Sequence, residues 1–397
     1  VARNGDVEVL HRQGLPHSLG LLYEELTEHL GFMRSSDEYK VMGLAAHGVP
    51  RFLPEFRDLV RVEPPAFRIA PVRFEEFAPR RGSDGEFDRR HADLAASVQT
   101  RLEEAILELA DWLQRATETR NLVMAGGVAL NCVANARLAA EGRFDRIWVQ
   151  PAAGDAGTSL GAALKVAREL GDRVTPMTTA ALGRAWSDRE IEATLREAKL
   201  RFEPCADVAK EAARAIAADG IVAWFQGRSE FGPRALGHRS LLANPGPPEN
   251  LNRLNAVKGR EAFRPVAPMV TNRRAADIFE GALPSPYMLF THRVKPAWRQ
   301  RIAAVVHIDG SARIQTVDER EEPLVARMLD EVERLTGVPV VINTSLNTAG
   351  RPMVDSPRDA LECFGSAPID MLAIGSFVVR REEAFARRRD FAAAASA

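Results

Sequence analysis

Cationic side chains gather in short loops in the second half of the chain. The loop 227–239 directly follows the apolar segment 221–225 and carries Arg228, Arg234 and Arg239 among glycine and proline residues. Guanidinium groups match the oxygens of a phosphate through paired hydrogen bonds. Three arginines in a loop of this kind therefore predict a phosphate-binding site.

Two further segments carry side chains of similar chemistry. Lys258, Arg260 and Arg264 share one face if their segment is extended, because the side chains of a strand alternate. Ser345 and Asn347 follow an apolar segment and offer a hydroxyl and an amide to a polar ligand. Solvated surface charge explains any one of these groups, but it explains poorly why all three adjoin apolar strands or proline and glycine turns. A shared site for an anion is the better interpretation.

Small residues mark two turns in the first half of the chain. Gly126 and Gly127 lie between an expected strand and an expected helix that begins near Asn131. Backbone N–H groups at such a turn can bind an anion, although a tight turn alone also explains the two glycines. Asp155 lies at the next turn of this kind, where it is either a helix cap or a ligand of a metal or substrate. Both alternatives stay open on these residues.

The eight histidines give no metal-binding pattern by themselves. No two of them are three or four positions apart, so no helix presents two imidazole rings on one face. The sequence therefore contains no visible chelating pair of histidines.

The overall composition is that of a globular protein with a formal net charge of −1. This balance excludes binding to nucleic acid or to a membrane through bulk charge, and no apolar run is long enough to span a membrane. The first residues show no secretory-signal pattern, and the three scattered cysteines are typical of a reducing compartment. We therefore expect a cytoplasmic protein with no membrane partner and no nucleic-acid partner.

Hydrophobic periodicity predicts the elements that must position these residues. In the first half we expect a strand at 7–10, helices at 18–30 and 91–117, irregular chain at 50–90, strands at 122–125 and 146–149, and helices at 128–138 and 158–170. After the aperiodic residues 171–190 we expect helices at 188–198 and 206–218, and strands at 221–225, 302–308, 339–342 and 371–379. This order predicts α/β architecture with parallel strands, followed by an α+β domain with a mixed sheet.

Longer strings around these residues resemble those of a known enzyme family. Lys258-x-Arg260 and Ser345-x-Asn347 resemble the K-x-R and S-x-N signature of YrdC-like domains, which form carbamoyl-adenylate-type intermediates from ATP. Gly-Arg-Ser-Glu-Phe-Gly-Pro-Arg-Ala-Leu-Gly, Phe-Arg-Pro-Val-Ala-Pro and Asn-Thr-Ser-Leu-Asn are similar to strings of O-carbamoyltransferases of the nodulation-U and tobramycin-carbamoyltransferase type. The resemblance continues in order along the chain, including Ala-Gly-Gly-Val-Ala-Leu-Asn and Gly-Asp-Ala-Gly-Thr-Ser-Leu-Gly in the first half.

The resemblance implies an α/β plus α+β architecture of two domains. It implies the C-terminal part of an actin-like (ASKHA, Kae-like) carbamoyl-transfer domain at 1–172, a linker at 173–190, a YrdC-like domain that forms carbamoyl-adenylate at 191–385, and a fraying tail at 386–397. Family members carry a further lobe before this part, with a His-x-x-x-His metal motif. We therefore expect a fragment or a truncated protein, with apolar surface exposed where that lobe packs.

The resemblance also implies a two-step reaction. The YrdC-like domain would take carbamoyl phosphate and ATP, with Mg²⁺, to carbamoyl-adenylate, and the other domain would transfer the carbamoyl group to a hydroxyl of a sugar, antibiotic or signal molecule. The residues expected to hold carbamoyl phosphate and the nucleotide phosphates are Arg228, Arg234, Lys258, Arg260, Arg264, Arg313, Ser345 and Asn347. Those expected to be catalytic are Arg234, Lys258, Arg264 and Ser345. Gly126, Gly127 and Asn131 would bind the nucleotide of the transfer site, and Asp155 would be a ligand of Fe²⁺.

Two other functions stay open. Transfer RNA threonylcarbamoylation uses both types of domain, but the near-neutral charge and the lack of a basic tract disfavour tRNA as a partner. The third alternative is a non-catalytic nucleotide-binding subunit that needs the missing lobe from another chain. A homodimer is also an open alternative.

Overall fold

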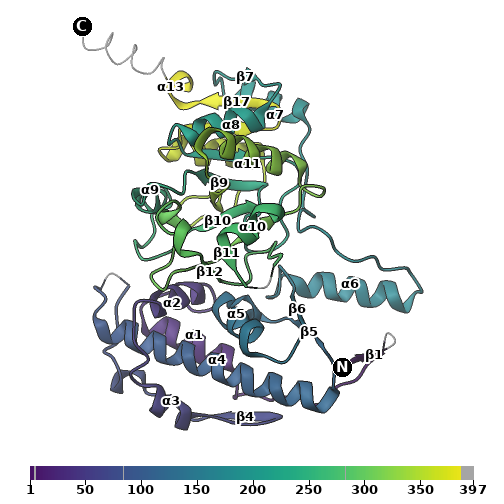
Figure 1. The fold of residues 1–397 in the computed structure, drawn as a ribbon, viewed down its shortest axis with the longest axis vertical. Coiled ribbons are helices and arrows are strands. Elements are labelled where there is room, and N and C mark those ends of the chain that lie inside the picture. Colours follow the sequence, from purple (N-terminus) through teal and green to yellow (C-terminus); the bar gives the residue numbers. More distant parts are fainter. Residues whose placement is uncertain (4–5, 84, 282, 386–397) are drawn as a thin grey trace. The chain divides into compact units, whose positions relative to one another are not determined.

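The computed structural model describes residues 1–3, 6–83, 85–281 and 283–385, and it divides into two compact units (Figure 1). Unit 1 consists of Val1–Thr158 with Leu289–Thr291, and unit 2 of the described residues of Ser159–Met288 and His292–Ala397. The domain limits expected from the sequence stay predictions. The fraying expected at 386–397 lies outside the described residues.

A long helix organises unit 1. Helix α4 spans Arg89–Thr117 and begins at a capping box, in which Asp88 and His91 each accept a hydrogen bond from the other's backbone N–H. Its buried face includes Leu94 and Val98, as the sequence periodicity predicts. Helices α2, α3 and α5 pack against it. The other elements of unit 1 are α1 (Leu19–His29), α2 (Glu38–Ala45), α3 (Leu53–Leu59), α5 (Cys132–Glu141), β1 (Ala2–Arg3), β2 (Asp6–Val7), β3 (Val60–Glu63), β4 (Ala66–Ile69), β5 (Asn121–Met124), β6 (Arg146–Val149) and the 3-10 turns Phe74–Glu76 and Gly127–Leu130.

The sequence predicted the longest of these elements but not several short ones. The strand expected at 7–10 is wrong, because β2 ends at Val7, and helix α2 was not expected. The helices expected at 18–30 and 91–117 are present. The irregular chain expected at 50–90 is wrong in part, because α3 and the antiparallel pair β3–β4 lie there. These elements contain four to seven residues each, too few to give a recognisable hydrophobic period.

Strands β5 and β6 pair in parallel, with α5 between them in the chain, as the sequence predicted. This two-stranded sheet leaves large apolar side chains exposed. Val123 of β5 is 73% exposed and Trp148 of β6 is 43% exposed. Exposed apolar residues on adjacent strands mark this sheet as a surface that another element could cover.

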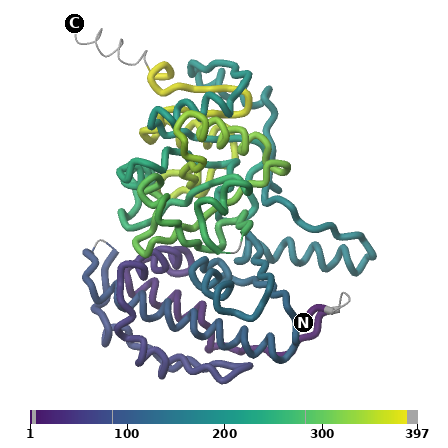
Figure 2. The backbone as a smooth tube through the Cα atoms, viewed as in Figure 1, coloured from purple at the N-terminus to yellow at the C-terminus, as the bar shows by residue number. Residues whose placement is uncertain are grey.

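An eight-stranded mixed sheet forms the centre of unit 2. Its order is β14 (Gln315–Val317), β10 (Ala267–Thr271), β15 (Val341–Ser345), β9 (Arg239–Ala243), β8 (Val222–Phe225), β16 (Met371–Ile374), β17 (Phe377–Arg380) and β7 (Glu203–Pro204). The pairs β14–β10 and β8–β16 are parallel and the other neighbours are antiparallel, which confirms the mixed sheet expected from the sequence. Segments far apart in the chain therefore lie side by side, as the teal and yellow parts of the tube in Figure 2 show.

Helices cover both faces of this sheet. Successive residues of β8 point to opposite sides, so Val222 and Trp224 pack in one core with α8 and α11, whereas Ala223 and Phe225 pack in the other with α7, α9 and α12. Every residue of β8 is buried, as expected of a central strand. The helices outside unit 1 are α6 (Gly157–Glu169), which does not pack on this sheet, α7 (Asp188–Glu197), α8 (Val208–Ala217), α9 (Glu249–Val257), α10 (Asn272–Ile278), α11 (Pro323–Thr336), α12 (Pro357–Ser366) and α13 (Arg381–Ala384).

A small three-stranded sheet accompanies the large one. It consists of β11 (Phe279–Glu280), β12 (His292–Val294) and β13 (Ser311–Ala312), all antiparallel, with 3-10 turns at Pro296–Trp298 and Ala303–Val305. The strand expected at 302–308 is therefore wrong. Ile302, Ala304 and Val305 are buried, but a 3-10 turn rather than a strand lies there, and Ile308 is exposed.

The extended conformation expected from Lys258 to Arg264 is also wrong. Lys258 caps the C-terminus of α9, and Gly259 has a φ of +53°. The N–H of Arg260 then donates to the carbonyl of Asn255 at 3.1 Å, which closes the helix end. A left-handed glycine after a helix is a common C-terminal cap, so the cations are positioned by a turn.

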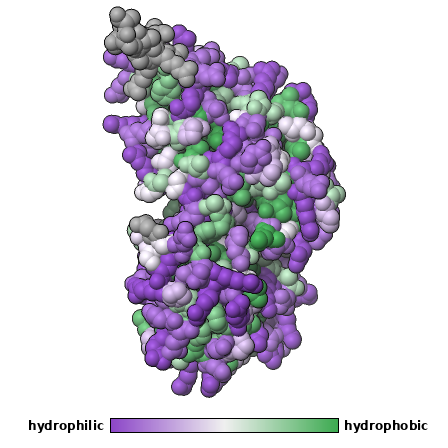
Figure 3. Space-filling view, turned by 90° about the vertical axis from the view of Figure 1, so that its left-hand side faces the viewer, coloured by the Kyte–Doolittle hydropathy of each residue, from purple (hydrophilic) through white to green (hydrophobic). Residues whose placement is uncertain are grey.

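No residue of α6 is buried, and none of the helices in the described part of the chain is both long and apolar enough to cross a membrane. One face of the molecule, shown in Figure 3, carries mainly hydrophilic residues with apolar residues between them.

Candidate functional site

One end of the large sheet collects the residues that the sequence singled out. Strand β15 ends at Ser345, beside the start of β9 at Arg239. Because β10 is antiparallel to β15 and β14 is parallel to β10, the residues that precede these two strands, including Arg264 and Arg313, reach the same end. Strand β8 is antiparallel to β9, so the loop 227–239 also leaves the sheet there.

Lys258 joins two of the sequence segments in one buried cluster. Its Nζ donates to the carbonyl oxygen of Ser345 at 2.6 Å and to Ser345 Oγ at 3.0 Å, and it also contacts Oδ1 of Asn347. Ser345 Oγ donates to the same Oδ1 at 2.9 Å. Only 7% of Lys258 is exposed. The residues of the K-x-R and S-x-N strings are therefore neighbours in space, although almost ninety positions separate them in the chain.

The electrostatics of this cluster favour an anion. Burial lowers the pKa of Lys258 well below its ordinary value, and the charges of Arg260 and Arg264 lower it further. A phosphate placed among these cations would offset both effects, because an opposite charge stabilises the ammonium form. The cluster therefore holds like charges together, an arrangement that a bound anion would stabilise.

A buried carboxylate that the sequence reasoning missed shapes the arginine loop. Glu230 Oε1 accepts hydrogen bonds from the backbone N–H groups of Leu236 at 2.6 Å, His238 at 3.0 Å and Arg239 at 3.2 Å. Glu230 is only 8% exposed. The only sign of this role in the sequence is that a single glutamate occurs within a string of glycine, proline and arginine. The loop that carries Arg234 therefore depends on one acidic side chain.

The three arginines of this loop have different surroundings. Arg239 is fully buried and stacks on the ring of Phe225 at 3.7 Å, while its Nη1 donates to the carbonyl of Gln226 at 2.8 Å. Arg228 is exposed, and its Nη2 donates to the carbonyl of Leu182 at 3.0 Å. The phosphate cradle expected from all three arginines is therefore wrong for Arg239, which supports the loop from inside.

Two buried amides fix the position of Arg234. The Nδ2 of Asn343 donates to the carbonyl of Ala235 at 3.1 Å and to Gln315 Oε1 at 2.6 Å. The Nε2 of Gln315 donates to the carbonyl of Leu236 at 2.8 Å. Because Asn343 and Gln315 belong to β15 and β14, these bonds hold the chain next to Arg234 against the end of the central strands.

The other expected cations lie around the same end of the sheet. Arg260 Nε donates to Asn255 Oδ1 at 2.5 Å, and Arg264 Nη1 donates to Glu261 Oε2 at 3.4 Å. Nε of Arg313 is buried and has no hydrogen-bond partner among the described residues. A buried guanidinium nitrogen without a protein partner is costly unless a ligand pairs with it. Their role in binding phosphate stays a prediction, and their common location supports it.

A hollow of about 340 Å³ lies at the same end of the sheet, beside the arginine loop. Gln226 and Gly227 after β8, and Gly375 and Ser376 after β16, form part of its lining, with Trp186. This volume is at the small end of the range for ligand pockets, which is about 300–1,000 Å³. Its lining does not include Arg234, Lys258 or Arg264, and Arg184 stacks on the Trp186 ring at 3.6 Å, so the hollow is a neighbour of the cation cluster.

The two glycine turns of unit 1 also lie side by side. The N–H of Gly126 donates to the carbonyl of Ala153 at 2.7 Å, two positions before Asp155. Gly126 has a φ of +100°, which favours glycine, and a Cβ at Gly126 or Gly127 would point into open space. Asn131 caps α5 with its side chain. Their role in nucleotide binding stays a prediction.

Asp155 lies in an exposed turn, where its carbonyl oxygen accepts a hydrogen bond from Thr158 Oγ1 at 2.6 Å. Within the described ranges no group of three or more His, Cys, Asp or Glu side chains could hold a metal ion. A single carboxylate does not make a site for iron, which takes several protein ligands. The residues present therefore do not fit the metal that the resemblance implied, and the ligand role of Asp155 stays a prediction.

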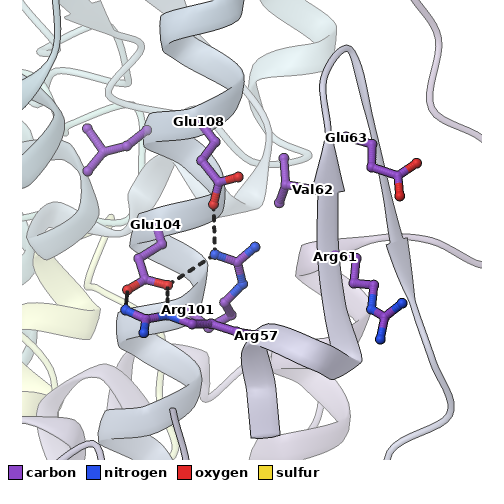
Figure 4. Close-up of a pocket in the computed structure, with 8 residues that line it drawn as sticks. Arg57, Arg61, Val62, Glu63, Arg101, Glu104 and Glu108 are labelled. Atoms are coloured by element: carbon purple, nitrogen blue, oxygen red, sulfur yellow. Dashed lines mark hydrogen bonds and ion pairs between the residues drawn. The ribbon is translucent and has the colours of Figure 1, made fainter. Parts of the chain in front are cut away.

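Unit 1 has a hollow of about 620 Å³ between α4 and the α3–β3 segment, and charged residues line it (Figure 4). Nε and Nη2 of Arg57 both donate to the carboxylate of Glu104. Nη1 of Arg101 donates to Glu104 at 3.0 Å and to Glu108 at 2.8 Å. The lining contains three arginines and three glutamates, so the charges balance. Unlike the end of the large sheet, this hollow has no excess charge with which to attract an anion.

We expect Glu104→Gln to lower the free energy of unfolding by about 2–3 kcal/mol, because the buried Arg101 loses a charged partner. Hydrogen bonds from Arg57 lower the pKa of Glu104. A carboxyl group with a lowered folded-state pKa stabilises the protein above its unfolded-state pKa, and this stabilisation is lost as the pH falls through the folded-state pKa.

Urea unfolding of both proteins across a pH series measures this effect. The difference between wild type and Glu104→Gln should be largest near neutral pH and should shrink in acid. Glu63→Gln is the matched control, since Glu63 lines the same hollow but is exposed. An equal loss in both variants, or a difference that does not depend on pH, would contradict the role of the ion pairs.

Comparisons with known proteins agree with the resemblance noted in the sequence. Residues 3–164 match the family model described as Carbamoyltransferase N-terminus, and residues 213–381 match the model described as Carbamoyltransferase C-terminus. An uncharacterized protein of Synechocystis is 37% identical over 94% of this chain and 69% of its own length. Nodulation protein NolO of Bradyrhizobium diazoefficiens is 39% identical over 93% of this chain and 70% of its own length.

Other relatives are matched over a smaller part of their length. The chain spans 56% of nodulation protein NolNO of Sinorhizobium fredii, with 39% identity, and 48% of nodulation protein U of the same species, with 40% identity. Among solved structures, full-length HypF in its phosphate- and nucleotide-bound form is 17% identical, with a TM-score of 0.29 over 47% of this chain and 23% of that chain.

Proposed function

Because the chain belongs to the carbamoyltransferase family, we propose that unit 2 forms carbamoyl-adenylate from carbamoyl phosphate and ATP, and that the chain serves transfer of the carbamoyl group to a hydroxyl of a small molecule. The acceptor class is the one that the sequence resemblance implies, a sugar, antibiotic or signal molecule. The two family models cover both units of the chain.

The proposed first step balances with one water molecule. Carbamoyl phosphate and water give carbamate and phosphate, and an oxygen of carbamate then attacks the α-phosphorus of ATP while pyrophosphate leaves. The products are carbamoyl-adenylate, phosphate and pyrophosphate. Both leaving groups carry negative charge, so the barrier is mainly electrostatic. Mg²⁺ bound to the ATP phosphates would neutralise part of this charge.

The cations at the end of the sheet suit this step. Carbamoyl phosphate and ATP repel each other, and preorganised cations that meet both phosphates lower the energy of bringing them together. Lys258 would contact the phosphates from its buried position beside Ser345 Oγ, and Arg234, Arg264 and Arg313 would approach from the surrounding loops. Arg260 and Asn347 would complete the first cluster, because each lies next to Lys258.

One observation carries the proposal. Four segments of the chain, from 227–239, 258–264, 311–315 and 343–347, reach one end of the sheet, and each carries a residue of the family strings or a cation aligned with them. A structural role alone would not require Lys258 to be buried beside Arg260 and Arg264, because that arrangement is unfavourable without an anion.

Exchange of labelled pyrophosphate into ATP tests the proposed function. The purified chain should catalyse exchange only when carbamoyl phosphate is present, because pyrophosphate returns to ATP from the adenylate. Exchange should be lost in Arg234→Ala. If wild type shows no exchange above this variant, or exchange without carbamoyl phosphate, the proposed first step is contradicted.

A further inference from the structure

A tight turn before β13 places three polar side chains in a chain of hydrogen bonds. The N–H of His307 donates to the carbonyl of Ser311 at 2.7 Å, which closes the turn. Ser311 Oγ donates to Asp309 Oδ1 at 2.7 Å, and Nδ1 of His307 lies 3.2 Å from the same Oγ. Arg293 faces this turn from β12, where it pairs with Ser311 across the strands.

The hydrogen bonds fix which nitrogen of His307 carries the proton. The backbone N–H and the hydroxyl of Ser311 lower the pKa of Asp309 although burial raises it, so this carboxylate is ionised and can only accept. The single hydroxyl proton of Ser311 is therefore directed to Asp309. Ser311 Oγ must then accept from His307 Nδ1–H, which leaves Nε2 of His307 without a proton.

Nε2 of His307 is buried and has no hydrogen-bond partner among the described residues. Burial lowers the pKa of His307 to about 4 against the opposing charge of Asp309, so the ring is neutral at pH 7. Nε2 is thus a buried acceptor whose lone pair is unused, and such a group is costly unless a donor reaches it.

One cation of the proposed phosphate site, Arg313, acts on the ring of His307 through its positive charge. Nε of Arg313 is itself buried without a partner in the described part of the chain. A guanidinium and a neutral acceptor suit a fully ionised phosphate ester poorly, since its oxygens have no proton to give to Nε2. They match a molecule that joins an anion to an N–H donor.

We propose that Nε2 of His307 accepts a hydrogen bond from the amino group of carbamoyl phosphate while Arg313 holds its phosphate. This inference rests on the proposed function and adds a residue that selects the carbamoyl group. The amino group is the only donor of carbamoyl phosphate in its ionised form. Acetyl phosphate has a methyl group in its place, so it would leave Nε2 unpaired in a dry site.

Calorimetric titrations of the chain with carbamoyl phosphate, acetyl phosphate, inorganic phosphate and AMP test this assignment. Wild type should bind carbamoyl phosphate more tightly than acetyl phosphate by about tenfold or more, as expected for one buried hydrogen bond. His307→Leu should lose this preference and keep its affinity for inorganic phosphate. His307→Gln should keep part of the preference, because its amide oxygen can replace Nε2 as acceptor.

The outcomes separate this inference from the proposed function. If wild type binds carbamoyl phosphate and acetyl phosphate equally, or if His307→Leu keeps the preference, the role of His307 is wrong while the proposed function stands. If His307→Leu weakens AMP and leaves carbamoyl phosphate unchanged, Nε2 serves the nucleotide instead and the inference is overturned. If wild type binds neither carbamoyl phosphate nor inorganic phosphate, the proposed function fails. Equal binding of the two acyl phosphates by wild type overturns the inference even if His307→Leu does not fold, and His307→Gln then serves as the second variant.

Discussion

Lys258→Met should lower carbamoyl-phosphate-dependent ATP–pyrophosphate exchange by about 10²- to 10³-fold, because it removes a preorganised cation from the developing phosphate charge. Methionine keeps the apolar stem, so the change leaves little empty volume. The lost hydrogen bonds to Ser345 and Asn347 destabilise the protein, whereas relief of repulsion by Arg260 and Arg264 stabilises it. We therefore expect the free energy of unfolding to change by less than about 1 kcal/mol.

Separation of activity from stability makes this variant diagnostic. If Lys258 served only to stabilise the fold, its substitution would lower activity and stability together. Lys165→Ala is the matched control, since Lys165 lies on α6 with 77% of its side chain exposed. Exchange at the wild-type rate in Lys258→Met, or an equal loss in the control, would contradict the role of Lys258 in the reaction.

Glu230→Ala should lower the free energy of unfolding by about 3–5 kcal/mol, since three backbone N–H groups and the charge of Arg239 lose their buried partner. The loop 227–239 should lose its shape, and exchange should fall with it because this loop carries Arg234. Urea unfolding and the exchange rate of the folded fraction measure the two effects separately.

Glu230→Gln divides the contribution of the hydrogen bonds from that of the charge. Glutamine keeps an oxygen that can accept from the three N–H groups but carries no charge, so its loss of stability should be intermediate. Glu249→Ala is the control, because Glu249 is exposed at the start of α9. If Glu230→Ala is as stable as this control, the carboxylate does not organise the loop.

The sequence predicted the parts of the fold that have a clear period or a continuous apolar run. The long helix α4 and the strand β8 are examples, since Leu94 and Val98 recur at helical spacing and every residue of β8 is apolar and buried. The apolar run at 302–308 led to a wrong prediction of a strand, because its apolar residues serve a buried 3-10 turn. Apolar character alone does not distinguish a strand from a buried turn.

For the candidate site, the sequence indicated the residue types and their family strings, but not their contacts. Lys258 and Ser345 meet through the pairing of β10, β15 and β9, a non-local arrangement that no local pattern encodes. The role of Glu230 in the loop and the proposed role of His307 depend on which atoms face them, so a sequence gives little sign of either. Arg239 shows the converse, because its position in an arginine-rich loop suggested a ligand contact and its burial assigns it to the interior.

Calorimetric titration of the chain with carbamoyl phosphate tests most directly whether the cations at the end of the sheet form one anion site. We expect saturable binding at a single site, displaced by inorganic phosphate and weakened as salt is added, since the site is built from cations. Binding should be abolished in the double variant Arg264→Ala with Arg313→Ala. Wild-type affinity in that double variant, or no binding to the wild-type chain, would contradict a shared anion site at the end of this sheet.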